Sequence, residues 1–264
     1  MNEIMTGSGA AFNPALQAQY DNPGLVPEHP GIIAGWAQDA AAYRERGGRL
    51  DVPYGASPRE RYDWFGPDDA PVAIFIHGGY WQKLDKSFFS HCAAGLVAHG
   101  VAVAVVGYEL CPQVTLRQIV QQIRAACRVL RPVLAFGHSA GGHLSAILLA
   151  MGDVPAALPI SGVFDVTPLR HTRIGDALAL AEGEARALSP MFMPPPAGRL
   201  HAVVGGAESD AFRAQTRDLA ARWSGTSEEW PGANHFTVLA ALADPDGRMV
   251  RQAVALARGR PAGG

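Results

Sequence analysis

The octapeptide FGHSAGGH at residues 136–143 places a serine in the surroundings of a nucleophile. Ser139 lies between Gly137 and Gly141 in the pattern G-x-S-x-G. An apolar segment precedes the serine and a helical segment follows it, so we expect a sharp strand-to-helix turn that exposes its Oγ atom. Glycines make such a turn tight and let the helix pack closely on the strand. Because serines flanked by glycines also occur in ordinary turns, a catalytic role requires partners elsewhere in the chain.

A serine hydroxyl attacks a carbonyl carbon efficiently only when a base takes its proton and a carboxylate orients that base. In doubly wound hydrolases the three residues follow one another as serine, acid and histidine. The histidines after Ser139 are His143, His171, His201 and His235. Only His235 lies beyond the last strand-like segment, in the loop PGANHF, so we predict that it is the base.

The acid is expected directly after the strand-like segment HAVVGG, which ends at Gly206. Glu208 and Asp210 both follow it, and we favour Glu208 because it is closer to the strand end. Asp210 is well placed to cap the next helix, which is a structural role. Asp165, after the segment ALPISGVF, is a third candidate, with the anchoring of a turn or lid as its alternative role.

Attack on a carbonyl also requires hydrogen-bond donors for the developing oxyanion. The segment IHGGYW at residues 76–81 is similar to the HGGG-type loop of esterases, with Tyr80 in place of the third glycine. The candidate donors are the backbone N–H groups of Gly78, Gly79, Tyr80 and Ala140, the last being the residue after the serine. We rank Gly78 below the other three. His77 is expected to brace the loop and not to act as a base.

The elements that must position these residues form a regular alternation. Apolar segments of four to eight residues, such as VAIFIHGG, VAVAVVGY and LHAVVGG, alternate with helical patterns. The segment TLRQIVQQIRAACRVL repeats apolar residues at helical spacing, and Thr115 is its expected N-cap. This alternation predicts an α/β fold, a mostly parallel, doubly wound sheet with helices on both faces. Functional groups gather at the carboxyl ends of the strands in such a sheet.

The domain organisation is expected to be simple. The length favours a single α/β domain over residues 1–264, with an N-terminal helical extension over residues 1–50. One irregular insertion, residues 166–198, ends in MFMPPPAG. It is either a small lid or an ordinary long surface loop.

The composition excludes several classes of protein. Hydrophobic residues make up 48% of the 264-residue chain and charged residues 17%, so a large core can be buried and extensive disorder is excluded. The formal net charge of −2 argues against a dedicated nucleic-acid binder. The histidines and cysteines lack zinc-site spacing and no phosphate loop is present, so we expect neither a metal nor a cofactor. The sequence leaves the oligomeric state open, a homodimer included.

The cellular compartment is inferred from cysteines and apolar segments. The three cysteines form no C-x-x-C motif, which fits a reducing compartment. The N-terminus lacks the pattern of a signal peptide, and no apolar run approaches the ~18 residues of a membrane span. We therefore expect a cytoplasmic protein without a membrane partner.

Several motifs resemble the α/β-hydrolase superfamily, and more narrowly the kynurenine formamidase (arylformamidase) group with its bacterial esterase relatives. The resemblance rests on HGGYWQKLDKS, GHSAGGH, VVGGAESDAFRAQ and NHF, and AQYDNPGLVPEHP and LDVPYG extend it over nearly the whole chain. It implies a triad of Ser139, Glu208 and His235. The acid is glutamate here where the animal enzymes carry aspartate, which moves the carboxylate by one methylene.

The resemblance also implies a substrate, namely a small acyl group on an aromatic amine or an alcohol, and so a small-molecule ester or amide as partner. Trp81 and Tyr108 are expected either to line an apolar pocket for the leaving group or to belong to the core. Alternative functions are a short-chain carboxylesterase without a formamidase role, a hydrolase of another amide, and a noncatalytic binding protein on the same scaffold. The complete triad argues against the last.

Overall fold

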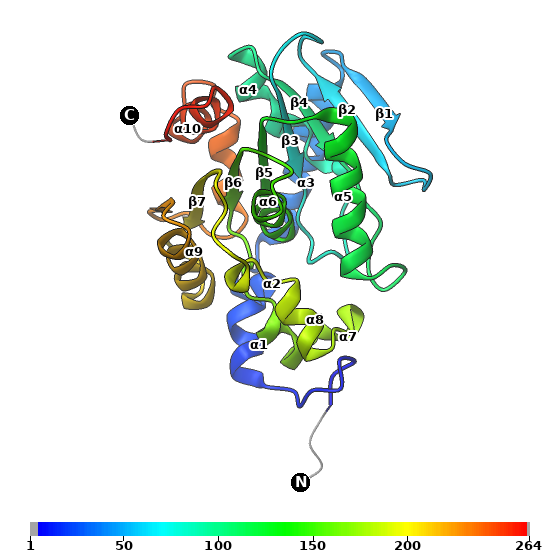
Figure 1. The fold of residues 1–264 in the computed structure, drawn as a ribbon, viewed down its shortest axis with the longest axis vertical. Coiled ribbons are helices and arrows are strands. Elements are labelled where there is room, and N and C mark those ends of the chain that lie inside the picture. Colours follow the sequence, from blue (N-terminus) through cyan, green and yellow to red (C-terminus); the bar gives the residue numbers. More distant parts are fainter. Residues whose placement is uncertain (1–4, 263–264) are drawn as a thin grey trace.

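The fold is built on one eight-stranded sheet. The computed structural model describes residues 5–262. The expectation of no signal peptide depends in part on residues 1–4, which lie outside the described residues. The strand order is β1-β2-β4-β3-β5-β6-β7-β8 (Figure 1). β3 to β8 run parallel, whereas β1 and β2 form an antiparallel edge. The strands are β1 (Arg49–Pro53), β2 (Arg61–Phe65), β3 (Val72–Ile76), β4 (Ala102–Val106), β5 (Leu134–His138), β6 (Ala156–Ile160), β7 (Arg199–Gly205) and β8 (Thr226–Trp230).

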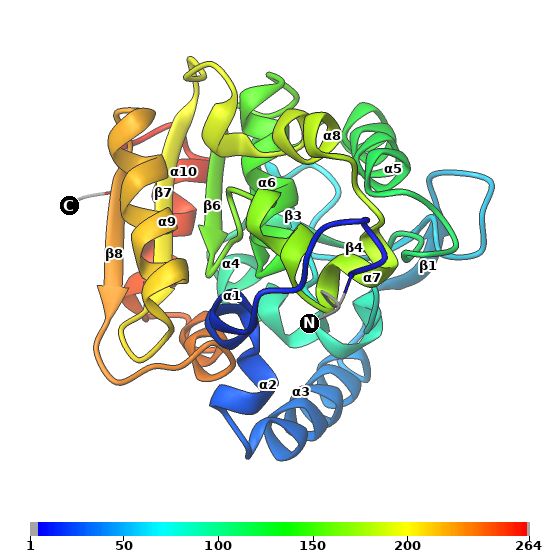
Figure 2. The ribbon, with the colours of Figure 1, turned by 90° about the horizontal axis from the view of Figure 1, so that it is seen from below.

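Helices cover both faces of this sheet (Figures 1 and 2). Apolar side chains of α5, α6 and α9 join one buried cluster, and those of α3, α4 and α10 join a second cluster. The α-helices are α1 (Pro14–Tyr20), α2 (Asn22–Leu25), α3 (His29–Arg44), α4 (Ala94–Ala98), α5 (Leu116–Leu130), α6 (Ala140–Ala150), α7 (Ile174–Leu178), α8 (Glu182–Ala187), α9 (Asp210–Arg222) and α10 (Arg248–Ala257). The predicted doubly wound, mostly parallel α/β sheet is confirmed. None of the helices in residues 5–262 is both long and apolar enough to cross a membrane.

Local sequence explains where α5 begins. The Thr115 hydroxyl accepts a hydrogen bond from the Gln118 N–H at 3.2 Å, and the Gln118 side chain accepts one from the Thr115 N–H at 2.8 Å. This reciprocal pair is a capping box, which satisfies two backbone donors that the helix leaves unpaired. The apolar stripe of α5 is then buried against the sheet, with Ile119 and Ile123 fully excluded from solvent. The predicted N-cap is confirmed.

The N-terminal segment packs against elements that come much later in the chain. α1 contacts α9 and the 3-10 turn Thr167–His171 (Figure 2). The Asn13 N–H donates to the His171 carbonyl oxygen at 2.8 Å, and the Ser209 hydroxyl donates to the Gln19 carbonyl oxygen at 2.7 Å. Residues 166–198, the expected insertion, contain that turn, α7, α8 and the turn Pro190–Phe192. Both segments therefore meet beside the loops that follow the parallel strands.

Candidate active site

Ser139 occupies a tight turn between β5 and α6. Its φ and ψ angles are 57° and −115°, a conformation that is uncommon for a residue other than glycine. The glycines around it are required sterically, because a Cβ atom on Gly141 would collide with the Ile76 carbonyl oxygen. A Cβ atom on Gly137 would come within 2.6 Å of the same oxygen. The glycines thus allow α6 to approach β3 and β5, as the sequence predicts.

His235 and Glu208 form a buried pair beside this turn. The Nδ1 atom of His235 lies 2.6 Å from Oε2 of Glu208, whose side chain is fully excluded from solvent. The other carboxylate oxygen, Oε1, accepts hydrogen bonds from the Gly205 N–H at 2.7 Å and the Ser161 hydroxyl at 2.5 Å. Since Nδ1 of His235 contacts the carboxylate, Nε2 is the ring nitrogen left to exchange a proton. The structure therefore brings the predicted base and the favoured acid together.

The other two candidate acids lie away from His235. Asp210 is the first residue of α9, and its side chain is 91% exposed and faces Arg213 at 3.5 Å. Asp165 accepts hydrogen bonds from the N–H and the hydroxyl of Thr167 at 2.9 and 2.6 Å, which anchors a turn. Neither carboxylate bonds to an imidazole among the described residues, whereas Glu208 contacts His235.

The remaining candidate histidines make structural contacts. His143 is buried and its Nε2 atom lies 2.7 Å from the Leu188 carbonyl oxygen. His171 bonds to the Ala11 carbonyl oxygen at 2.9 Å, and His201 bonds to the Thr226 hydroxyl at 2.7 Å. Burial lowers the pKa of His143 to about 4, so its ring is neutral at physiological pH.

His138 is a part of the site that the sequence did not single out. It precedes the serine, and its Nε2 atom lies 2.7 Å from the main-chain carbonyl oxygen of His235. Burial and the adjacent His235 ring lower the pKa of His138 well below its usual value. A neutral ring that donates from Nε2 ties the turn at Ser139 to the loop that carries His235. The histidine at the middle position of the motif GHS is the only signal in the sequence for this contact.

The predicted oxyanion loop follows β3 and lies against the turn at Ser139. A Cβ atom on Gly78 would come within 3.0 Å of the Cβ of Ser139, so the two segments touch. Gly79 and Tyr80 have positive φ angles of 104° and 50°, and their N–H groups make no hydrogen bond within residues 5–262. Ala140 begins α6, so its N–H lacks a partner inside the helix. Unpaired donors thus flank the serine from both sides.

The side chain of Tyr80 joins this loop to the N-terminal segment. Its hydroxyl donates to the Tyr20 carbonyl oxygen at 2.7 Å and accepts a hydrogen bond from the Asn22 side chain at 3.3 Å. Burial raises the pKa of the Tyr80 hydroxyl well above its usual value, so it stays protonated and can donate. The Tyr80 side chain therefore ties the oxyanion loop to α1 and α2.

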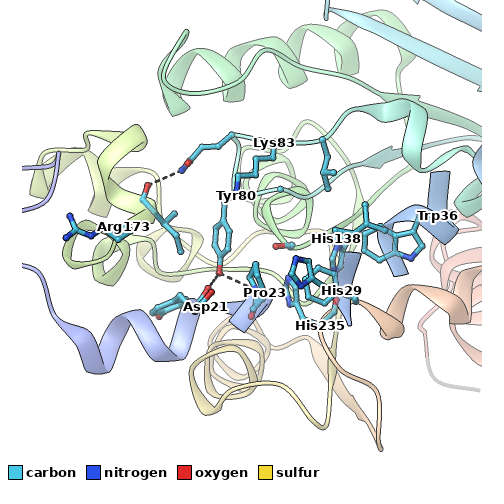
Figure 3. A pocket seen from close by; sticks show the side chains of 18 of the residues that line it. Asp21, Pro23, His29, Trp36, Tyr80, Lys83, His138, Arg173 and His235 are labelled. Atoms are coloured by element: carbon cyan, nitrogen blue, oxygen red, sulfur yellow. Dashed lines mark hydrogen bonds between the residues drawn. The ribbon is translucent and has the colours of Figure 1, made fainter. Parts of the chain in front are cut away.

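A cavity of about 330 Å³ lies in front of Ser139 and His235 (Figure 3). One wall is supplied by the N-terminal helices, from Gln17 to Trp36, and another by the oxyanion loop and the residues after it. The insertion at residues 166–198 supplies only Arg173 and Ile174. The apolar part of the cavity includes aromatic rings, and the ring centroid of Phe236 lies 5.4 Å from that of His29 and 6.0 Å from that of Trp36. The N-terminal extension is thus the main cover of the site.

Trp81 and Tyr108 do not line this cavity, which corrects the predicted pocket. Both are fully buried in the core. The Tyr108 ring stacks on His77 with centroids 4.2 Å apart, and its hydroxyl donates to the His77 carbonyl oxygen at 2.8 Å. The Trp81 ring packs edge-on against His143 at 4.9 Å. These aromatic residues support the oxyanion loop from behind, whereas Trp36 of α3 and Phe236 belong to the cavity lining.

His77 braces the same loop. Its Nδ1 atom lies 2.8 Å from the Gly78 carbonyl oxygen. Burial lowers the pKa of His77 to about 4, so the ring is neutral and donates from Nδ1. Within residues 5–262, no group of three or more histidine, cysteine, aspartate or glutamate side chains is placed to hold a metal ion.

Comparisons with known proteins give relatives of two kinds. The sequence is 31% identical to a kynurenine formamidase of Salmo salar over 228 residues, which covers 75% of this chain and 78% of the relative. A structure from Silicibacter sp. tm1040, provisionally described as a thioesterase, matches with a TM-score of 0.84 at 34% identity and covers 89% of this chain and 97% of its own. Esterase B of Lactobacillus Rhamnosis matches with a TM-score of 0.66 at 21% identity over 90% and 97% of the two chains, a likeness that shows the fold alone. No family model matches the chain. The expected α/β-hydrolase fold is confirmed.

Proposed function

The chain belongs to the kynurenine formamidase family of hydrolases, and we propose that it cleaves small acyl amides or esters by a serine mechanism. The observation that carries this proposal is the His235–Glu208 pair, 2.6 Å apart, at the edge of the cavity that Ser139 also lines. A nucleophile, a base and an orienting carboxylate at one cavity are the requirements of acyl transfer.

The first half-reaction forms an acyl-enzyme. Ser139 Oγ attacks the carbonyl carbon while His235 Nε2 takes its proton, and Glu208 stabilises the resulting imidazolium. The oxyanion accepts hydrogen bonds from the N–H groups of Gly79, Tyr80 and Ala140, which have no protein partner to give up. The imidazolium then protonates the leaving nitrogen or oxygen, the bond between it and the carbonyl carbon breaks, and an amine or alcohol departs.

The second half-reaction regenerates the enzyme. A water molecule gives a proton to His235 and attacks the acyl carbon, and the same three N–H groups hold the second oxyanion. Collapse of this intermediate breaks the bond between Ser139 Oγ and the acyl carbon. The serine recovers its proton from His235, and a carboxylic acid is released, which is formic acid when the acyl group is formyl.

The walls of the cavity support an aromatic leaving group. Trp36, His29 and Phe236 contribute rings to the lining of the cavity that Ser139 also lines, and such rings pack favourably against another aromatic ring. The Salmo salar relative is a kynurenine formamidase, which suggests an aryl formamide such as N-formylkynurenine as substrate. The structure from Silicibacter sp. tm1040, described as a thioesterase, supports a second candidate, a carboxylesterase of short acyl esters.

A comparison of substrates tests the formamidase assignment. We expect kcat/KM for N-formylkynurenine to exceed that for p-nitrophenyl acetate, and longer acyl esters to be poorer still, because a cavity of about 330 Å³ limits the size of the acyl group. The measurement is initial-rate kinetics with purified protein on all three substrate types. If the protein hydrolyses esters but cleaves the formamide no faster than background, the formamidase assignment is wrong and the carboxylesterase assignment replaces it.

Lys83 gives the cavity an unpaired positive charge. It lines the cavity beside Tyr80 (Figure 3) and is exposed, and no ion pair within residues 5–262 includes it. The nearest carboxylate in the sequence, Asp85, is already paired with Arg59 at 3.2 Å. The other cation of the lining, Arg173, pairs with Asp176 at 3.6 Å. Lys83 is therefore available to an acidic group on the leaving group, such as the carboxylate of an amino acid.

Replacing Lys83 with methionine is expected to change the choice of substrate. Loss of an exposed ion pair should lower kcat/KM for N-formylkynurenine about two- to fivefold. The rate for formanilide, which has no carboxylate, should stay unchanged. Lys83→Arg keeps the charge and serves as the control. Its kcat/KM values for N-formylkynurenine and for formanilide should both stay close to those of the unmodified protein. An equal fall for the charged and the neutral substrate would contradict a role in carboxylate recognition.

A further inference from the structure

Ser161 makes a contact that the mechanism above does not use. It follows β6, is fully buried, and its hydroxyl lies 2.5 Å from Oε1 of Glu208. Oε1 has no free proton to give when the carboxylate is ionised, so the hydroxyl is the donor. Donation from a hydroxyl to a carboxylate is a charge-assisted hydrogen bond, which is stronger than one between neutral groups.

The backbone of Ser161 is fixed in an unusual conformation. Its φ angle is 52°, in the left-handed region, and its N–H donates to the Val203 carbonyl oxygen at 2.7 Å. Val203 belongs to β7, the strand that leads into the loop with Glu208. The hydrogen bond between the strand ends thus sets the distance between the hydroxyl and the carboxylate. A strained residue held by its surroundings at a functional site suggests a role in that site.

The two oxygens of Glu208 have separate partners. Oε1 is held by Ser161 and by the Gly205 N–H at 2.7 Å, and Oε2 is left for His235 at 2.6 Å. A glutamate side chain has one more torsion than aspartate, and its terminal torsion is broad. Without the hydroxyl, Oε1 would keep only the Gly205 N–H as a donor. The second donor therefore matters more for a glutamate acid than for the shorter aspartate.

We propose that Ser161 is a positioning residue, which fixes the Glu208 carboxylate so that it holds His235 in the productive tautomer and orientation. The inference rests on the proposed serine mechanism and adds a fourth member to its hydrogen-bonded chain. Groups that orient a catalytic ligand in this way commonly affect activity without touching the substrate.

The test replaces Ser161 with alanine and, separately, with glycine. Both variants lack the hydroxyl, but glycine adopts the positive φ angle without strain, so the pair separates the loss of the hydrogen bond from backbone effects. We expect kcat to fall about tenfold in both variants while KM changes less than about twofold. The downfield proton resonance of the His235–Glu208 hydrogen bond should shift or broaden in both.

A purely structural role gives a different pattern. In that case the melting temperature would fall, more for Ser161→Ala than for Ser161→Gly, while kcat and the downfield resonance stayed as in the unmodified protein, and the proposal would be wrong. Failure of the serine mechanism itself is distinguished by Ser139→Ala. If that variant is inactive while both Ser161 variants retain full kcat, only the positioning role is rejected.

Discussion

Replacement of Ser139 by alanine is expected to lower kcat by roughly 10⁵- to 10⁶-fold, the loss typical when the nucleophile of a serine hydrolase is removed. The substitution leaves no atom that can attack the carbonyl carbon. The turn itself should survive, because the glycines around it determine how closely α6 approaches the sheet. The measurement is kcat/KM on a formamide and an ester, together with labelling by a fluorophosphonate probe, which forms a covalent bond with an activated serine.

Ser145 offers a matched control for this experiment. It is a buried serine on the same helix, and its hydroxyl donates to the Gly141 carbonyl oxygen at 2.8 Å without lining the cavity. Ser145→Ala should be labelled as strongly as the unmodified protein, whereas Ser139→Ala should not be labelled. Equal labelling of Ser139→Ala, or no labelling of the unmodified protein, would overturn the serine mechanism and favour the binding-protein alternative.

The fold could be predicted from the sequence because most of its strands are buried on both faces. Such strands read as continuous apolar segments, and β3, β4 and β5 were recognised in this way. β8 shows the limit, since its sequence TSEEW carries no apolar pattern. It lies at the sheet edge, where partial exposure removes the signal. The segment before β4 forms the 3-10 turns Lys86–Phe88 and Ser90–Ala93 and the five-residue α4 in place of one continuous helix.

The arrangement of Ser139, Glu208 and His235 could be predicted because topology alone determines it. Each residue follows a parallel strand, and the carboxyl ends of parallel strands meet at one edge of the sheet. The close pairing of Glu208 with His235 agrees with the order of the chain. Chain order also explains why Glu208 and not Asp210 contacts His235, since Asp210 already belongs to α9.

The cavity walls could not be predicted in this way. Trp36 lies on α3, more than a hundred residues before the serine, and no local pattern indicates that this helix faces the site. Trp81 was the more obvious choice because it adjoins the oxyanion loop, yet the positive φ of 59° at this residue accompanies a side chain buried in the core. Ser161 was missed because its role depends on a hydrogen bond across two strand ends.

Replacing Glu208 with glutamine is expected to lower kcat by about 10³- to 10⁴-fold, and the surrounding donors explain why. The position of Oε1 receives hydrogen bonds from Ser161 and the Gly205 N–H, so the amide oxygen of a glutamine must lie there. Its NH₂ group then faces Nδ1 of His235 and can only donate. The imidazole must accept at Nδ1 and carry its proton on Nε2, the atom that should take the proton of the serine.

Asp210→Asn is the matched control, because it makes the same chemical change two residues along the chain. Its carboxylate is exposed and its pairing with Arg213 is weak, so kcat should stay within about twofold. The measurement is kcat of both variants on the same formamide or ester. Their melting temperatures show whether either variant is unfolded. A small loss of kcat in Glu208→Gln together with a large loss of kcat in Asp210→Asn would reverse the assignment of the acid. Because the wrong tautomer, and not a lost charge alone, inactivates Glu208→Gln, raising the pH should not restore its rate.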